Sequence, residues 1–151
     1  LLQLDSHNFF YIHTLKIRHM IRFQDLKAGD LIQADFSGQR FEGEVTDINH
    51  EDRQICVHNG DQDAWFDPND LYSIPLDDRQ MTKLGFEKVV NEDKSVKYMR
   101  GPFRLMIPAP DQFNELDIWY REDRRFMHHL IGVHELQNFY RQMTKVDLSR
   151  V

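Results

Sequence analysis

Several features are scarce in this sequence, and each scarcity excludes a class of protein. The 151 residues contain a single cysteine, Cys56, so no internal disulfide can hold the fold together. No apolar run approaches the roughly 20 residues that a membrane-spanning helix needs. We therefore expect a protein of the cytoplasm that makes no contact with a membrane.

The short motifs that mark known chemistry are also absent. Only seven glycines occur, most of them at expected turns, and none belongs to a phosphate-binding loop, a dinucleotide fingerprint or a G-x-S-x-G elbow. Cys56 lies between Ile55 and Val57 in a strand-like run, and no Cys-His signature surrounds it. The sequence thus predicts no catalytic residue, no cofactor and no metal ligand, and it favours a protein that is not an enzyme.

Residues 1–19 do not have the pattern of a signal peptide. Their apolar stretch is interrupted by residues such as His7 and Lys16, and no small-residue cleavage site follows. The chain begins with Leu1, and Met20 opens a stretch that resembles a start. We interpret residues 1–19 as an N-terminal extension and leave open whether it is native.

Residues 20–75 are predicted to form a small SH3-like β-barrel. Turn signals and alternating apolar residues predict five short strands, at 31–36, 40–49, 53–58, 62–66 and 71–74. Ser37-Gly38 and Asn59-Gly60 mark turns, and a change of phase near Thr46-Asp47 predicts a β-bulge. Five short strands with a short corner before the last one are typical of such a barrel.

Residues 76–151 are predicted to form a compact α-β-β-β-β-β-α unit, which makes the chain α+β. Asp77 and Gln80 form a capping-box pattern, and Gly85 suits a left-handed C-cap, so a helix is expected at 78–84. Strands are expected at 86–90, 96–100, 103–107, 116–120 and 124–128, and a final helix at 133–145. The final helix carries an apolar stripe: Val133, Leu136, Phe139, Tyr140 and Met143.

Charge is divided unevenly along the chain, whose total is −6. Residues 20–75 carry four basic and twelve acidic residues, a formal charge of −8, whereas residues 76–151 carry thirteen basic and twelve acidic residues, a charge of +1. A segment at −8 repels phosphates, so nucleic-acid binding by the barrel is disfavoured. A basic partner surface fits this charge; solubility alone is the simpler explanation.

One basic cluster lies on the expected hairpin at 119–129. Arg121, Arg124 and Arg125 alternate there with aromatic residues, a combination that suits contact with phosphates and stacking on bases. Acidic residues inside and just before the cluster favour another interpretation, a solvated hairpin with cross-strand ion pairs.

Three histidines follow or adjoin this hairpin and raise the alternative of a hydrolase with a nonlocal site. His128 and His129 are adjacent on an expected strand and should face opposite ways, while His134 lies beyond a strand-to-helix break. The helical zinc pattern HExxH is absent. Isolated histidines are therefore favoured over a metal site.

Trp65 is a candidate binding residue of the barrel. If Ala64 and Phe66 point inward, Trp65 points outward, and with Tyr72 it suits an aromatic peptide-binding surface. A large exposed aromatic is uncommon outside interfaces, so burial of Trp65 against the unit at 76–151 or against the N-terminal segment is the favoured alternative.

The order of several segments resembles a family of small uncharacterised bacterial and prophage-borne proteins. The resemblance rests on residues 25–30, 74–76, 84–87 and 133–140, the last reading Val-His-Glu-Leu-Gln-Asn-Phe-Tyr. Where the pattern has Thr-Gly after the last helix, this chain has Thr144-Lys145. The resemblance implies an accessory product of a mobile element and carries no known function. In its most recognisable piece His134, Gln137 and Asn138 form either a polar binding face or a helix start whose side chains bond neighbouring backbone.

The favoured function from sequence is thus a non-enzymatic protein-interaction or accessory module that binds another protein or its own copy. The candidate binding residues are Trp65, Tyr72, Arg121, Arg124, Arg125, His134 and Asn138. The alternatives are a nucleic-acid-associated accessory protein using the hairpin and the histidine-based hydrolase.

Overall fold

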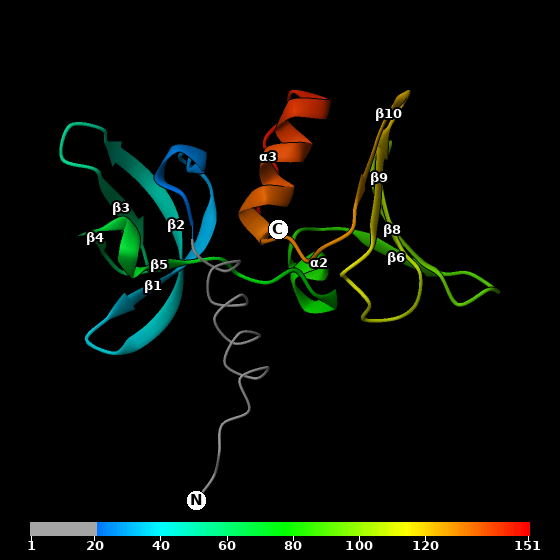
Figure 1. The fold of residues 1–151 in the computed structure, drawn as a ribbon, viewed down its shortest axis with the longest axis horizontal. Helices are drawn as coiled ribbons and strands as arrows, with labels where there is room; N and C mark the ends of the chain where they lie inside the picture. Colours follow the sequence, from blue (N-terminus) through cyan, green and yellow to red (C-terminus); the bar gives the residue numbers. More distant parts are fainter. Residues whose placement is uncertain (1–20) are drawn as a thin grey trace, which may run out of the picture. The chain divides into compact units, whose positions relative to one another are not determined.

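The computed structural model describes residues 21–151, which divide into two units between Ile74 and Pro75 (Figure 1). The described chain is mixed α and β and mostly strand, with two antiparallel five-stranded sheets and two α-helices. Between residues 21 and 151, neither helix has the length and apolar character needed to cross a membrane. The predicted extension at 1–19 lies outside the described residues.

The first unit is one antiparallel sheet in the order β4-β3-β2-β1-β5. Its elements are η1 (Phe23–Asp25), β1 (Leu31–Phe36), β2 (Gln39–Asn49), β3 (Gln54–His58), β4 (Asp63–Phe66), η2 (Pro68–Asp70) and β5 (Leu71–Tyr72). Within residues 21–74 no pairing joins β4 to β5, so the sheet is open and the expected barrel is not closed. The last strand is shorter than predicted because β5 pairs with β1 only at Gln33 and Ala34.

Turn chemistry fixes the register of this sheet. Ser37 and Gly38 have φ of 54° and 83° and join β1 to β2 in a two-residue turn, with Phe36 opposite Gln39; positive φ at both central residues gives the twist that tight hairpins need. The Asp35 carboxylate accepts a hydrogen bond from the Gly38 N–H at 3.0 Å. The predicted bulge is confirmed as a register shift between Val45 and Asp47 in the pairing of β2 with β3.

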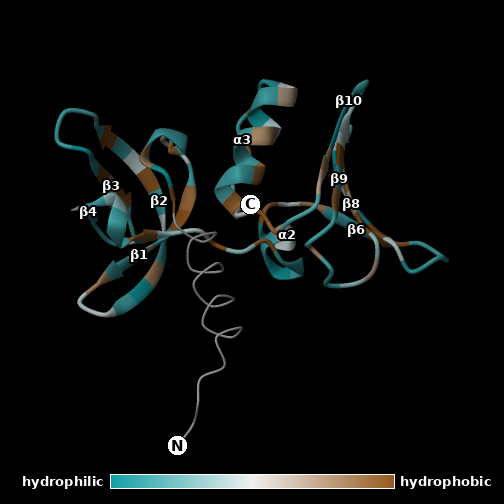
Figure 2. Ribbon diagram, in the orientation of Figure 1, coloured by the Kyte–Doolittle hydropathy of each residue, from teal (hydrophilic) through white to brown (hydrophobic). Residues whose placement is uncertain are grey.

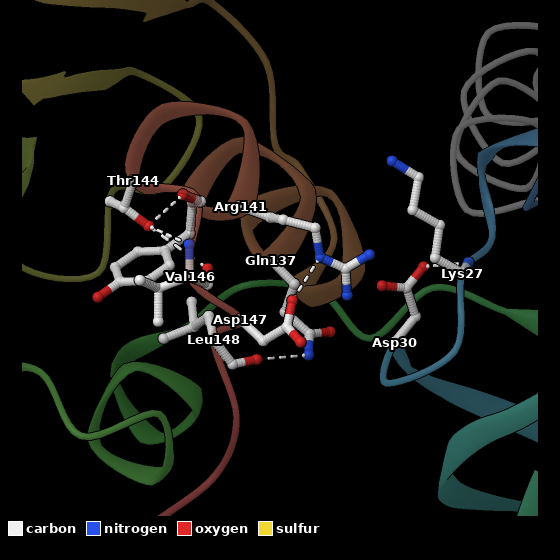
Figure 3. A network of polar contacts seen from close by, with 9 residues as sticks. Lys27, Asp30, Gln137, Arg141, Thr144, Val146, Asp147 and Leu148 are labelled. Carbon is white, nitrogen blue, oxygen red and sulfur yellow. Dashed lines mark hydrogen bonds and ion pairs between the residues drawn. The ribbon is translucent and has the colours of Figure 1, made fainter.

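Every strand of the first unit contributes apolar side chains to its core, and β4 contributes Phe66. Figure 2 shows the corresponding alternation of hydrophobic and hydrophilic positions along the ribbon. The buried members are Ile21, Phe23, Leu26, Ile32, Ala34, Val45, Ile55, Val57, Phe66 and Leu71. The turn that precedes β1 is held by the Lys27 backbone N–H, which donates to the Asp30 carboxylate at 2.9 Å (Figure 3).

The second unit has the predicted order of elements, with a sheet in the order β10-β9-β8-β7-β6. Its elements are α2 (Asp78–Lys83), β6 (Glu87–Val90), β7 (Val96–Arg100), β8 (Phe103–Ile107), β9 (Leu116–Tyr120), β10 (Asp123–Met127) and α3 (Val133–Thr144). Asp77 caps α2 as predicted, because its side chain accepts from the Gln80 N–H at 2.8 Å. Gly85 follows the helix with φ of 79°.

One face of this sheet packs against α3. Phe103 of β8 and Tyr140 of α3 lie with ring centroids 4.8 Å apart. The predicted helical stripe is buried except for Phe139, which is half-buried. The buried strand positions are Val96, Tyr98, Phe103, Leu105, Ile107, Leu116 and Ile118. The opposite face of each strand carries the half-buried and exposed side chains, as expected for an antiparallel sheet covered on one side.

Candidate binding site

Two arginines of the hairpin formed by β9 and β10 are paired with its own carboxylates. Arg124 donates to both carboxylate oxygens of Asp117, at 2.9 and 2.5 Å, and this hydrogen-bonded partner raises the pKa of Arg124. Arg125 donates to Asp123 at 3.2 and 3.4 Å and to the Gln142 side chain at 3.0 Å. The interpretation of cross-strand ion pairs is confirmed at Arg124, which pairs with Asp117 of β9, whereas Arg125 pairs with Asp123 of its own strand. These two arginines therefore have little positive charge left for a phosphate.

The aromatic rings of the hairpin are also occupied by its own arginines. The Arg124 guanidinium lies 5.5 Å from the centroid of the Trp119 ring and 5.0 Å from that of Phe126. Arg121 sits in the turn with φ of 56°, and its guanidinium lies 5.1 Å from the Tyr120 centroid. These stacked pairs reduce the ring area on which a base would stack.

The three histidines lie in different surroundings. His128 is exposed just beyond β10 and lies 3.0 Å from the Glu115 carboxylate, and His129 beside it is exposed as well. His134 is in the first turn of α3 and only 4% exposed. In the described part of the chain, no three His, Cys, Asp or Glu side chains are grouped so as to hold a metal ion.

The polar residues of α3 serve the local structure to a large extent (Figure 3). The Gln137 amide donates to the Leu148 carbonyl at 2.9 Å, and Arg141 donates to Asp147 at 2.6 Å, which ties the segment after the helix back onto it. Asn138 is half-buried one turn after His134. Gln137 thus bonds the backbone of the segment that follows α3, eleven residues along the chain, and not the backbone of the helix start.

Trp65 lies on the surface of the first unit and not in that unit's core. It lies in β4 opposite Cys56, with 50% of its surface exposed, while the next residue, Phe66, is buried in the core. The strand alternation therefore holds.

Tyr72 does not share the surroundings of Trp65. It lies in β5, at the opposite edge of the sheet from β4. The Arg40 guanidinium lies 3.6 Å from the centroid of its ring. Tyr72 is thus engaged by a side chain of its own unit.

Trp65 instead lines a hollow of about 430 Å³ at the surface of the first unit. The hollow gathers residues from the end of β1, the β1–β2 turn, the start of β3, the end of β4, and η2 with the residue before it: Asp35, Phe36, Ser37, Gly38, Gln54, Trp65, Phe66, Asp67 and Asp70. Phe36 is 65% exposed, so two large aromatic side chains face solvent in one place. We refer to these nine residues as the aromatic–acidic hollow.

The charge of the aromatic–acidic hollow is of one sign. Three carboxylates and no Lys, Arg or His line it. Asp35 accepts from the Gly38 N–H, and Asp67 accepts from the Gln54 amide, both neutral donors. Among residues 21–151, no basic side chain lies within ion-pair distance of Asp35, Asp67 or Asp70.

A second hollow, of about 330 Å³, lies in the second unit and differs in character. Its lining is mostly apolar and includes Met106 of β8, Leu116 of β9 and the exposed Phe126 of β10. Its two carboxylates are already engaged, Asp117 by Arg124 and Glu115 by His128. Because its carboxylates are already paired, this second hollow favours a cationic ligand less than the aromatic–acidic hollow does.

Phe36, Asp35, Asp67 and Asp70 are residues of the hollow that the sequence interpretation missed. Alternation along β1 puts Phe36 on the same face as the buried Ile32 and Ala34, so the local pattern predicts its burial and not its 65% exposure. No local signal exists for Asp67 and Asp70, which reach the hollow only through the pairing of the strands.

Neither protein-family models nor curated proteins nor solved structures give a match to this chain.

Proposed function

We propose that this chain is a protein-interaction module that works by binding rather than by catalysis, and that its first unit holds the partner. The observation that carries the proposal is the exposure of Phe36 and Trp65 in one hollow. Large aromatic side chains concentrate in binding sites, because burying them on association removes much apolar area from water.

The strand arrangement supports a peptide-binding module. In the first unit β1 lies between β2 and β5, and a short 3₁₀ turn, η2, leads into the last strand. We propose that this is an SH3-like barrel left open. Barrels of that kind recognise extended peptides in aromatic-lined grooves, and an accessory product of a mobile element acting in the cytoplasm is consistent with such a role.

The two alternatives have less support. Nucleic-acid binding by the 119–129 hairpin would use Arg121, Arg124 and Arg125, and two of these three, Arg124 and Arg125, already donate to carboxylates. A hydrolase built on His128, His129 and His134 would need converging rings, whereas His134 is buried and the other two are exposed.

The proposal is tested by affinity capture from cells that carry the gene, with and without nuclease, and with three baits. The baits are the unaltered chain, a Phe36→Ala/Trp65→Ala variant and a Phe126→Ala variant. Phe126 is a matched control, because it is an exposed aromatic of the second unit, 58% exposed, outside the aromatic–acidic hollow.

We expect a protein that survives nuclease treatment, is lost with the Phe36→Ala/Trp65→Ala bait and is retained with the Phe126→Ala bait. Circular dichroism of each bait establishes that it is folded. Recovery that vanishes with nuclease would contradict the proposal and favour the nucleic-acid alternative. A partner lost only with the Phe126→Ala bait would place the interaction on the second unit.

A further inference from the structure

We infer that the aromatic–acidic hollow takes the side chain of an arginine from the partner. The inference rests on the proposed function, because it assumes that the partner is a protein. It adds the chemistry by which that partner is recognised.

The first argument is charge complementarity. Asp35, Asp67 and Asp70 line the hollow, and among residues 21–151 none of them forms an ion pair with a basic side chain. Arg40 lies opposite Asp35 in the pairing of β1 with β2, but its guanidinium stacks on Tyr72. The surrounding segment 20–75 has a formal charge of −8. Like charges that are brought together without a counter-charge repel, so a cation entering the hollow gains both from the three carboxylates and from the field of the whole segment. An acidic or phosphorylated ligand is excluded by the same field.

The second argument is the combination of carboxylates with aromatic rings. A guanidinium is planar and donates through several N–H groups while its face stacks on a ring, so one arginine uses both kinds of wall at once. An ammonium is a compact and strongly hydrated charge that gives up more hydration on entering such a site. The first unit already contains this pairing at Arg40, which lies 3.6 Å over Tyr72.

The third argument is access. Asp67, Asp70, Phe36 and Trp65 are all exposed, so a side chain carried on an extended segment reaches them without opening the core. No described residue donates a hydrogen bond to the Asp70 carboxylate, and the Asp70 backbone N–H donates to the Asp67 carbonyl at 3.0 Å. Its carboxylate is therefore available to a donor from outside.

The inference is tested by titration calorimetry at about 0.15 M salt, where diffuse surface attraction is largely screened. The probes are short oligoarginine, oligolysine and oligocitrulline peptides of equal length. Citrulline has nearly the shape of arginine and no charge. The variants are Asp70→Asn, Trp65→Ala and the control Asp61→Asn, which removes the same charge at an exposed site outside the hollow.

We expect oligoarginine to bind more tightly than oligolysine and oligocitrulline not to bind. Asp70→Asn and Trp65→Ala should each weaken oligoarginine binding about tenfold, while Asp61→Asn changes it less than twofold. Equal binding of oligocitrulline or oligolysine would overturn the assignment to arginine. Equal losses with Asp70→Asn and Asp61→Asn would overturn the assignment to the hollow, since they would show a diffuse field.

Failure of this inference is distinguishable from failure of the proposed function. If a partner is captured through Phe36 and Trp65 while Asp70→Asn does not change oligoarginine binding, the proposed interaction module is supported and the inferred specificity for arginine is refuted. If oligoarginine binds at the hollow but no protein is captured, the inferred ligand chemistry is supported and the proposed protein partner is refuted.

Discussion

Gly43 is the position at which the smallest possible enlargement should disturb the first unit most. It lies in β2 opposite Ile32 of β1, and β2 is enclosed between β1 and β3. A Cβ atom there would lie 2.5 Å from Val57 Cγ1 and 2.8 Å from the His58 carbonyl oxygen. The carbonyl belongs to the backbone of the neighbouring strand, so it cannot turn aside as a flexible side chain would.

We expect Gly43→Ala to lower the free energy of unfolding by about 1–2 kcal/mol. Inserting a methyl group into a packed core costs about 1–3 kcal/mol. Alanine recovers about 0.5–1 kcal/mol of this, because it loses less backbone freedom on folding than glycine does. For a chain of this length the melting temperature should fall by about 2–4 °C per kcal/mol.

The assay is urea unfolding followed by tryptophan fluorescence. The chain has two tryptophans, one in each unit, so a Trp119→Phe background leaves Trp65 as the reporter of the first unit. Adding Val57→Ala removes one of the two obstructing atoms, and the double variant should be more stable than the sum of the single losses indicates. Unchanged stability of Gly43→Ala, or strict additivity with Val57→Ala, would refute the close approach of β2 and β3.

Three further predictions concern the second unit. Lys145 ends α3 with φ of 65°, and Lys145→Gly should raise the free energy of unfolding by about 1 kcal/mol, because the left-handed conformation is costly for any residue with a Cβ; an unchanged urea midpoint would contradict this. Asp77→Ala removes the cap that accepts from Gln80 and should lower stability by about 1 kcal/mol, whereas Asp77→Asn should restore most of it. Tyr98 donates to Asp78 at 2.7 Å, and this bond holds the pKa of Asp78 below its usual value; Tyr98→Phe should cost about 1.5–3 kcal/mol at neutral pH. Because the pKa of Asp78 is lowered in the folded state, this stabilisation is present above the unfolded value of 3.8 and is lost as the pH falls through the folded pKa. The difference in free energy of unfolding between Tyr98→Phe and the unaltered chain should therefore shrink in acid. A difference that grows in acid would contradict the role of the Tyr98–Asp78 hydrogen bond.

Local chemistry made most of the elements predictable. The Asp77 cap, the Ser37-Gly38 turn and the phase change at Thr46-Asp47 each act over a few residues, and each is found where the sequence indicates. Strand and helix bounds agree with the predictions to within one residue, apart from β5. That strand stops early because its length is set by its partner β1, which lies far away in the sequence.

Site membership was less predictable because it is nonlocal. Alternation along β4 indicates that Trp65 points outward, but it does not show whether another segment covers the indole. Phe36 and Asp67 are separated by most of the first unit and meet only through the pairing of four strands. The charge total of the segment was compatible with a basic partner but favoured solubility as its explanation, because a total does not show that carboxylates lie beside aromatic rings.

The two-residue turn after β1 affects the enthalpy and entropy with which the aromatic–acidic hollow binds a ligand. Ser37 and Gly38 are the only residues between the paired Phe36 and Gln39. This side of the hollow is therefore already ordered before a ligand binds. Little conformational entropy is then lost on binding. Lengthening the turn with glycines should weaken association without removing one contact, and the loss should appear as an unfavourable entropy at nearly constant enthalpy.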